Sequence, residues 1–267
     1  MQQSIRNRLP MRIILMISFA HHPKPHAMNI ALDIILPYAM SYFVFFALLL
    51  FCKRHNSNRL ADGSSSTQSG PLLISLHVAG IFLFGIIPFF SRHLSSPLNN
   101  NLHALGKWPL SVLLMVALLM IIIFSNFAGK KEMAPVQSFR GNNGLNYSFL
   151  ATYCLLRICF IAAYETWFRG FFLNDCIVAL GLGGAVAVNL GLYALLHVVN
   201  RKEEAIACIP FGLLLCFLCI WQQAVWPAIV VHLALTISYE AYIVRKLILN
   251  KLQHVDFNNR GIWLHRK

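Results

Sequence analysis

The chain has 267 residues, of which 58% are hydrophobic and only 12% are charged. Soluble domains have about a quarter of their residues charged, so this composition excludes an ordinary soluble protein. The net charge of +13 would indicate nucleic acid in a soluble protein. Here the cations flank apolar runs, where Lys and Arg set membrane topology. We therefore expect the lipid bilayer, and no nucleic acid, as a partner.

Several apolar runs reach the roughly 20 residues that a helix needs to cross a bilayer. They predict an all-α, polytopic transmembrane bundle of about seven spans in one compact unit. The predicted spans are 28–52, 71–91, 108–128, 148–172, 177–199, 204–221 and 224–244.

Four segments follow from these spans. Residues 1–27 form an N-terminal extension to which we assign no role, and 28–147 carry three spans. Residues 148–244 form the core with the informative polar residues. Residues 245–267 are a basic tail with alternating apolar residues, which suits a membrane surface. The excess of Lys and Arg in the tail and in alternate loops predicts a cytoplasmic C-terminus, in the plasma or inner membrane.

The most informative stretch is A-Y-E-T-W-F-R-G-F-F-L, which begins at Ala163. Glu165 and Arg169 lie four residues apart, so on a helix they share a face and can form an ion pair. Charged residues inside membrane spans are costly and are functional candidates by default. A purely structural ion pair between two helices is the alternative interpretation.

Two further spans carry polar residues at helical spacing. Asn189, Tyr193 and His197 form one polar stripe, four residues apart. His232 and Thr236 are also four apart. Interhelical hydrogen bonds, worth about 1 kcal/mol or less each, explain either stripe without any catalysis.

Taken together, Glu165, His197 and His232 suggest hydrolytic chemistry. A carboxylate and an imidazole can hold a water molecule and remove its proton. A second imidazole with a neighbouring hydroxyl can donate hydrogen bonds to a developing oxyanion. One Glu and two His residues are also a common zinc ligand set. Hydrolysis without a cofactor and a divalent metal such as zinc, held by these three residues, both stay open.

The order and spacing of these residues resemble the CPBP intramembrane proteases. This family includes type II CAAX prenyl endopeptidases and bacteriocin-processing-like, Abi-type proteins, and its motifs are E-E-x-x-x-R with F-R-G, F-x-x-x-H and H-x-x-x-N. The matching stretches span roughly 148–240 and begin at Glu165, Tyr193 and His232.

The resemblance implies an all-helical membrane protease that hydrolyses a peptide bond near the membrane in a membrane-associated protein or peptide. In that family, by resemblance, Glu165 and His197 would activate water. His232 and Thr236 would line the oxyanion hole, and Arg169 would position the acidic motif.

Two departures from the motifs affect the predicted activity. Tyr164 replaces the first Glu, and a phenol keeps its proton at neutral pH, so it is a poor base. Glu165 takes over that role only if its helix is turned by about 100° or shifted. Thr236 replaces Asn and donates through a shorter side chain. A catalytically weak or inactive membrane scaffold is therefore the second interpretation, and a transporter component using Asp33, Arg157 and Glu240 is the third.

The protease interpretation makes one geometric demand on the fold. If the spans are straight, Glu165 and His197 lie about 20 Å apart in depth. They approach each other only if the chain bends between Gly170 and Gly184, where Gly181 and Gly183 permit it.

Overall fold

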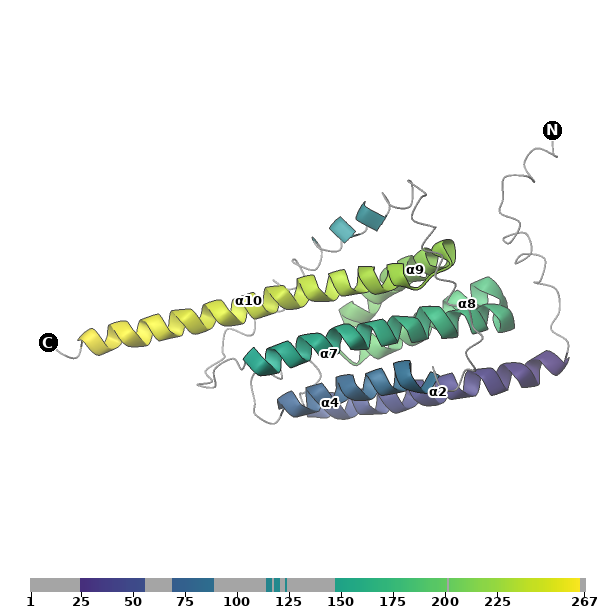
Figure 1. Cartoon of the computed structure of the whole chain (residues 1–267), viewed down its shortest axis with the longest axis horizontal. Coiled ribbons are helices and arrows are strands. Elements are labelled where there is room, and N and C mark those ends of the chain that lie inside the picture. Colours follow the sequence, from purple (N-terminus) through teal and green to yellow (C-terminus); the bar gives the residue numbers. More distant parts are fainter. Residues whose placement is uncertain are drawn as a thin grey trace, which may run out of the picture.

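The computed structural model describes residues 25–55, 69–88, 147–200 and 202–264, and short helical pieces between 114 and 123. Within these ranges the protein is helical and contains no strand, which confirms the predicted all-α bundle (Figure 1). Two α-helices continue directly into π-helical segments, η1 and η4. The elements are α2 (Pro25–Arg54), α4 (Ser69–Ile81), η1 (Phe82–Ile86), α7 (Tyr147–Glu165), η4 (Thr166–Phe172), α8 (Leu173–Val198), α9 (Lys202–Gln222) and α10 (Trp226–Leu264).

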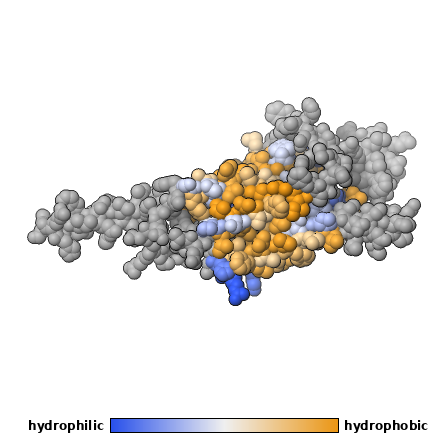
Figure 2. All heavy atoms as spheres, turned by 60° about the horizontal axis from the view of Figure 1, so that its bottom comes forward, coloured by the Kyte–Doolittle hydropathy of each residue, from blue (hydrophilic) through white to orange (hydrophobic). Residues whose placement is uncertain are grey.

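Four helical stretches are long and apolar enough to cross a membrane: Leu36–Arg54, Ser148–Val198, Lys202–Gln222 and Trp226–Arg245. A shorter apolar helix covers Gly70–Ile86. Large apolar side chains such as Phe43, Leu155 and Ile206 are exposed on the outside of the bundle, and the visible face is broadly apolar (Figure 2). A lipid environment accounts for such a surface, which is unusual for a soluble monomer.

Some sequence-based predictions fall outside the described residues. They are the first 24 residues of the N-terminal extension, most of the predicted span at 108–128, and most of the loops at 53–70, 92–107 and 129–147. The tail is helical, because α10 continues without interruption to Leu264.

The boundary between the predicted spans 148–172 and 177–199 lies too early, since the chain stays helical at 173–176 and reverses at Gly181, within the range where a bend was expected. Gly181 has φ 73° and ψ 171°, a region that only glycine adopts at ease. Beyond it, the Asn189 side chain reaches the Phe168 carbonyl oxygen at 2.7 Å. In a straight helix these residues would be about 30 Å apart. The bend that the protease interpretation requires is therefore present.

Contacts across the bundle fix the helix directions. Helix α10 is antiparallel to α7, because Glu165 meets His232 and Arg157 meets Glu240. Helix α4 runs parallel to α7 (Figure 1). The end of α2, the start of α9 and Arg245 consequently lie toward one end of the bundle. This arrangement agrees with placing their basic residues on one side of the membrane; which side that is stays a prediction.

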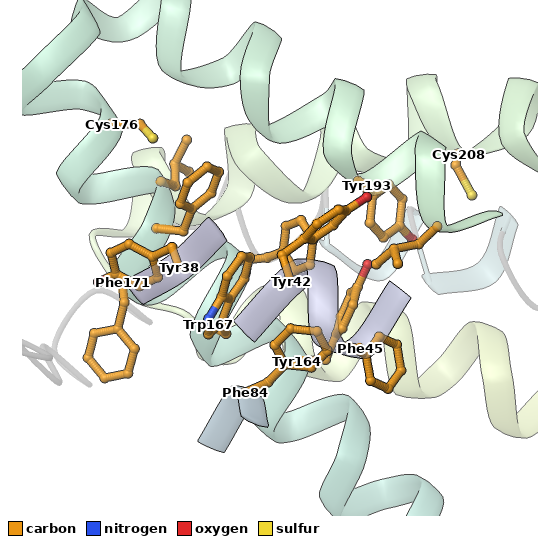
Figure 3. Close-up of a cluster of buried hydrophobic side chains, with 14 of the residues drawn as sticks. Tyr38, Tyr42, Phe45, Phe84, Tyr164, Trp167, Phe171, Cys176, Tyr193 and Cys208 are labelled. Atoms are coloured by element: carbon orange, nitrogen blue, oxygen red, sulfur yellow. The ribbon is translucent and has the colours of Figure 1, made fainter. Parts of the chain in front are cut away.

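Aromatic side chains from α2, η1 and η4 form the core (Figure 3). Trp167 and Phe168 are fully buried, and the Trp167 ring lies 5.1 Å from Phe84 and 5.5 Å from Tyr38. Aromatic pairs at such distances add about 0.5–1.5 kcal/mol beyond the area that they bury. The motif segment of η4 is thus held in the interior from two sides.

We expect Gly181→Ala to lower the free energy of unfolding by about 1–3 kcal/mol, because Ala is strained at a positive φ. Gly183→Ala is the matched control, since a Cβ there meets no atom within 4 Å and Ala favours a helix. Unfolding of both purified variants in detergent measures the effect. Equal stability of the two variants would contradict the reversal at Gly181.

Candidate active site

The centre of the site is a contact between Glu165, the last residue of α7, and His232 of α10. Glu165 Oε1 and His232 Nδ1 are 2.5 Å apart, although the residues are separated by 67 positions in the chain. The Glu165 side chain is fully buried and that of His232 is 10% exposed. An ionised carboxylate only accepts hydrogen bonds, so this contact places the hydrogen on Nδ1. The Nε2 of His232 is then an acceptor.

Arg169 neutralises Glu165 from one turn further along. Its Nη1 lies 3.2 Å from Glu165 Oε2, and the residue is 1% exposed. The guanidinium carbon is 4.4 Å from the centre of the Tyr193 ring and 5.4 Å from that of Phe168. Arg packs well on aromatic faces while its planar donors pair with a carboxylate. The predicted ion pair between Glu165 and Arg169 is therefore formed, and it is buried.

Four polar atoms of this cluster are buried without a hydrogen bond among the described residues, although one of them, Glu165 Oε2, is ion-paired with Arg169. They are Glu165 Oε2, Arg169 Nε, Arg169 Nη2 and the Tyr164 hydroxyl. Such groups are rare in protein interiors and call for an explanation, of which a catalytic role is one. The cluster thus has donors and an acceptor that suit a polar ligand such as water or a peptide group.

Tyr164 lies beside the pair although it precedes Glu165 directly in the chain. Its ring centre is 4.5 Å from that of Phe168 and 6.1 Å from that of His232. The π-helical segment Thr166–Phe172 begins immediately after Glu165. Such segments are uncommon and are frequent at functional sites. Nothing in the sequence pattern indicated this change of helix type.

His197 is connected to the Glu165–His232 pair through Tyr193. The rings of His197 and Tyr193 are 5.0 Å apart, and Tyr193 lies 6.4 Å from His232 and 6.1 Å from Tyr164. Tyr193, predicted only as a supporting residue, therefore lies between His197 and the Glu165–His232 pair. Among the described residues, no three His, Cys, Asp or Glu side chains are grouped to hold a metal ion. A metal at Glu165, His197 and His232 stays a prediction.

Asn189 connects three helical elements near the Glu165–Arg169 ion pair. Its Nδ2 donates to the Phe168 carbonyl oxygen at 2.7 Å, and its Oδ1 is 3.5 Å from Cys216 Sγ of α9. Asn189 is fully buried, so it holds α8, η4 and α9 together. Thr236 is 7% exposed and lies one turn beyond His232 on α10.

Gly212 of α9 is a site residue that sequence reasoning missed. A Cβ at this position would lie 3.0 Å from Tyr193 Cδ1 and 3.4 Å from Arg169 Nη2. The absence of a side chain therefore lets Arg169 lie flat against Tyr193. A lone glycine in an apolar helix was the only available signal, and it does not say what packs there.

The fold and the site together define a polytopic helical membrane protein with a buried, paired Glu–His–Arg cluster. Comparison with protein families finds that the model of the type II CAAX prenyl endopeptidase Rce1-like family matches residues 112–238. The match spans a little under half of the chain and confirms the resemblance drawn from the motifs. The match covers Glu165, Arg169, His197 and His232. Comparisons with curated proteins and with solved structures find no match.

We expect Gly212→Ala to destabilise the protein by about 1–3 kcal/mol, because the added methyl would lie 2.9 Å from Leu190 Cδ2 and would overpack it and the Arg169–Tyr193 contact. Gly191→Ala on α8 is the control, since a Cβ there meets nothing within 4 Å. The measurement is the midpoint of thermal unfolding in detergent for both variants. A stabilising Gly212→Ala would show that Arg169 does not depend on this contact.

Proposed function

We propose that the protein is an intramembrane peptidase that hydrolyses a peptide bond near the membrane with water activated by Glu165 and His232. The observation that carries this proposal is the buried contact between these two residues, from two helices of an Rce1-like segment. The substrate is a membrane-associated protein or peptide, and the family description suggests a CAAX-type C-terminal segment. We place the protein in the cell membrane with its C-terminus in the cytoplasm.

The geometry supports a simple division of roles. His232 Nε2 accepts a proton from a water molecule, whose oxygen attacks the carbonyl carbon of the substrate. Glu165 holds the imidazole through Nδ1 and stabilises the cation that forms. Arg169 pairs with the Glu165 carboxylate in the apolar interior. When the C–N bond breaks, the departing amine takes the proton from His232.

His197 and the buried polar groups complete the proposal. The Tyr164 hydroxyl has no hydrogen bond within the described part of the chain and is free to donate one to the developing oxyanion. His197, beyond Tyr193, and Thr236, beyond His232, are supporting candidates for the same task.

A catalytically inactive scaffold is the second candidate, and one observation favours it. Glu165 is fully buried, and a tyrosine occupies the position of the family's first Glu. A relative that has lost its base and sealed its site would keep the Glu165–Arg169–His232 cluster only as a polar core.

The decisive experiment compares membrane and secreted proteins in cells with and without the gene, and then follows any processed protein. Glu165→Gln and His232→Ala should each reduce processing at least about 100-fold, the scale expected for loss of a general acid or base. His197→Ala tests the supporting role. Glu203→Gln and His55→Ala, which change exposed residues of the same types, are the matched controls and should process normally.

Tyr164→Glu separates the two candidates. If the wild type processes a substrate and the Glu165 and His232 variants do not, the peptidase proposal stands. If only Tyr164→Glu cleaves, the protein is an inactive relative with an otherwise intact site. Processing that survives both Glu165→Gln and His232→Ala at equal protein levels would refute the proposal.

A further inference from the structure

A second polar cluster crosses the same two helices, at a distance from the candidate active site. Arg157 Nε of α7 lies 3.2 Å from Glu240 Oε1 of α10, and the Tyr153 hydroxyl donates to the same oxygen at 2.7 Å. Arg157 Nη1 lies 3.3 Å from His77 Nε2 of α4. Neither the motifs nor the proposed mechanism uses these residues.

The bonds in this second cluster are mutually consistent. His77 Nδ1 is 2.7 Å from the Leu73 carbonyl oxygen, so it carries the hydrogen and leaves Nε2 to accept from Arg157. Glu240 accepts from Tyr153 and balances the charge of Arg157. At the Glu165 cluster four polar atoms are buried without a hydrogen bond among the described residues, whereas in the second cluster Arg157 Nε alone is, and that atom is ion-paired with Glu240. The second cluster therefore has less unused bonding capacity than the first.

The spacing of the two clusters links them. Arg157 precedes Glu165 by eight residues on α7, and Glu240 follows His232 by eight residues on α10. The two helices are antiparallel, so the two contacts bridge the same pair of helices at two levels, about 12 Å apart along the helices. We call each of these contacts a rung. Sliding α10 along α7 by one residue, about 1.5 Å, would break both rungs at once.

We propose that the Arg157–Glu240 pair is a positioning device that sets the register of α7 against α10 and thereby brings His232 to Glu165. This inference rests on the proposed peptidase function for its catalytic consequence. Apolar side chains at this interface pack with little directional preference, whereas an ion pair with fixed donors selects one register. Specifying register is the best-attested use of a polar contact inside an apolar interface, and the Arg157 and Glu240 side chains are 30% and 13% exposed.

The first test uses a triple variant, Tyr153→Phe/Arg157→Met/Glu240→Met, next to Glu240→Gln. Replacing a partly buried ion pair by apolar residues of similar size changes stability little, so we expect the triple variant to unfold within a few degrees of the wild type. Its kcat should still fall by about 10- to 100-fold, the scale of a misplacement near 1 Å, while KM changes less than about threefold. If the triple variant has both the stability and the kcat of the wild type, the pair has only a stabilising role and the inference is overturned.

A second test needs no substrate and so separates this inference from the proposed function. Glu165→Gln is introduced into the wild type and into Glu240→Gln, and the midpoints of unfolding in detergent are compared. Sites this far apart normally behave additively. If the far rung sets the register, the shift caused by Glu165→Gln in the Glu240→Gln background is less than about half of its shift in the wild type.

The control for this cycle is Tyr42→Phe, which removes a hydrogen bond from Tyr42 to the Leu192 carbonyl oxygen on another face of the bundle. Its shift should be the same with and without Glu240→Gln. Equal shifts for Glu165→Gln in both backgrounds would overturn the register inference even for an active peptidase. If Glu165→Gln and Glu240→Gln are coupled but the protein shows no turnover, the register inference stands and only the proposed peptidase function is refuted.

Discussion

The structure depends on providing partners for the Glu165 carboxylate in an apolar interior. Burying an isolated carboxylate costs far more than the stability of a domain, so the group must be paired and hydrogen-bonded. Arg169 supplies the opposite charge from the same helix, and His232 supplies a hydrogen bond from α10. Because the two partners come from different directions, satisfying one carboxylate also fixes where α10 lies against α7.

The reversal at Gly181 brings the third participant to the same place. The part of α8 that follows Gly181 returns alongside the motif segment, where Asn189 binds the Phe168 carbonyl oxygen and Tyr193 covers Arg169. Without that turn, these residues would extend away from Glu165 along one straight helix. The conformational freedom of one glycine thus supports the ring of contacts around the arginine.

The two polar rungs on α7 and α10 differ in a way that suits different tasks. The Arg157–Glu240 rung gains further hydrogen bonds from Tyr153 and His77 and leaves one buried atom, Arg157 Nε, without a hydrogen bond among the described residues. The Glu165–His232 rung leaves more bonding capacity unused, close to an imidazole nitrogen that can accept a proton. The proposed roles, register for the first rung and chemistry for the second, follow the general arrangement of a precise site on a rigid support.

The sequence by itself determined the class of protein, because apolar length and the scarcity of charge leave a membrane bundle as the only way to bury these helices. It also determined the pairing of Glu165 with Arg169, since four-residue spacing is local geometry. The resemblance to the family followed from the order of the motifs, which can be recognised without knowledge of the fold. Only the tertiary structure decided that the break lies at Gly181, that Tyr193 stands between His197 and the acidic motif, that Gly212 lies against Arg169 and Tyr193, and that Arg157 pairs with Glu240. Those features depend on which helix faces meet across the bundle, and residue spacing within one helix carries no information about its neighbours.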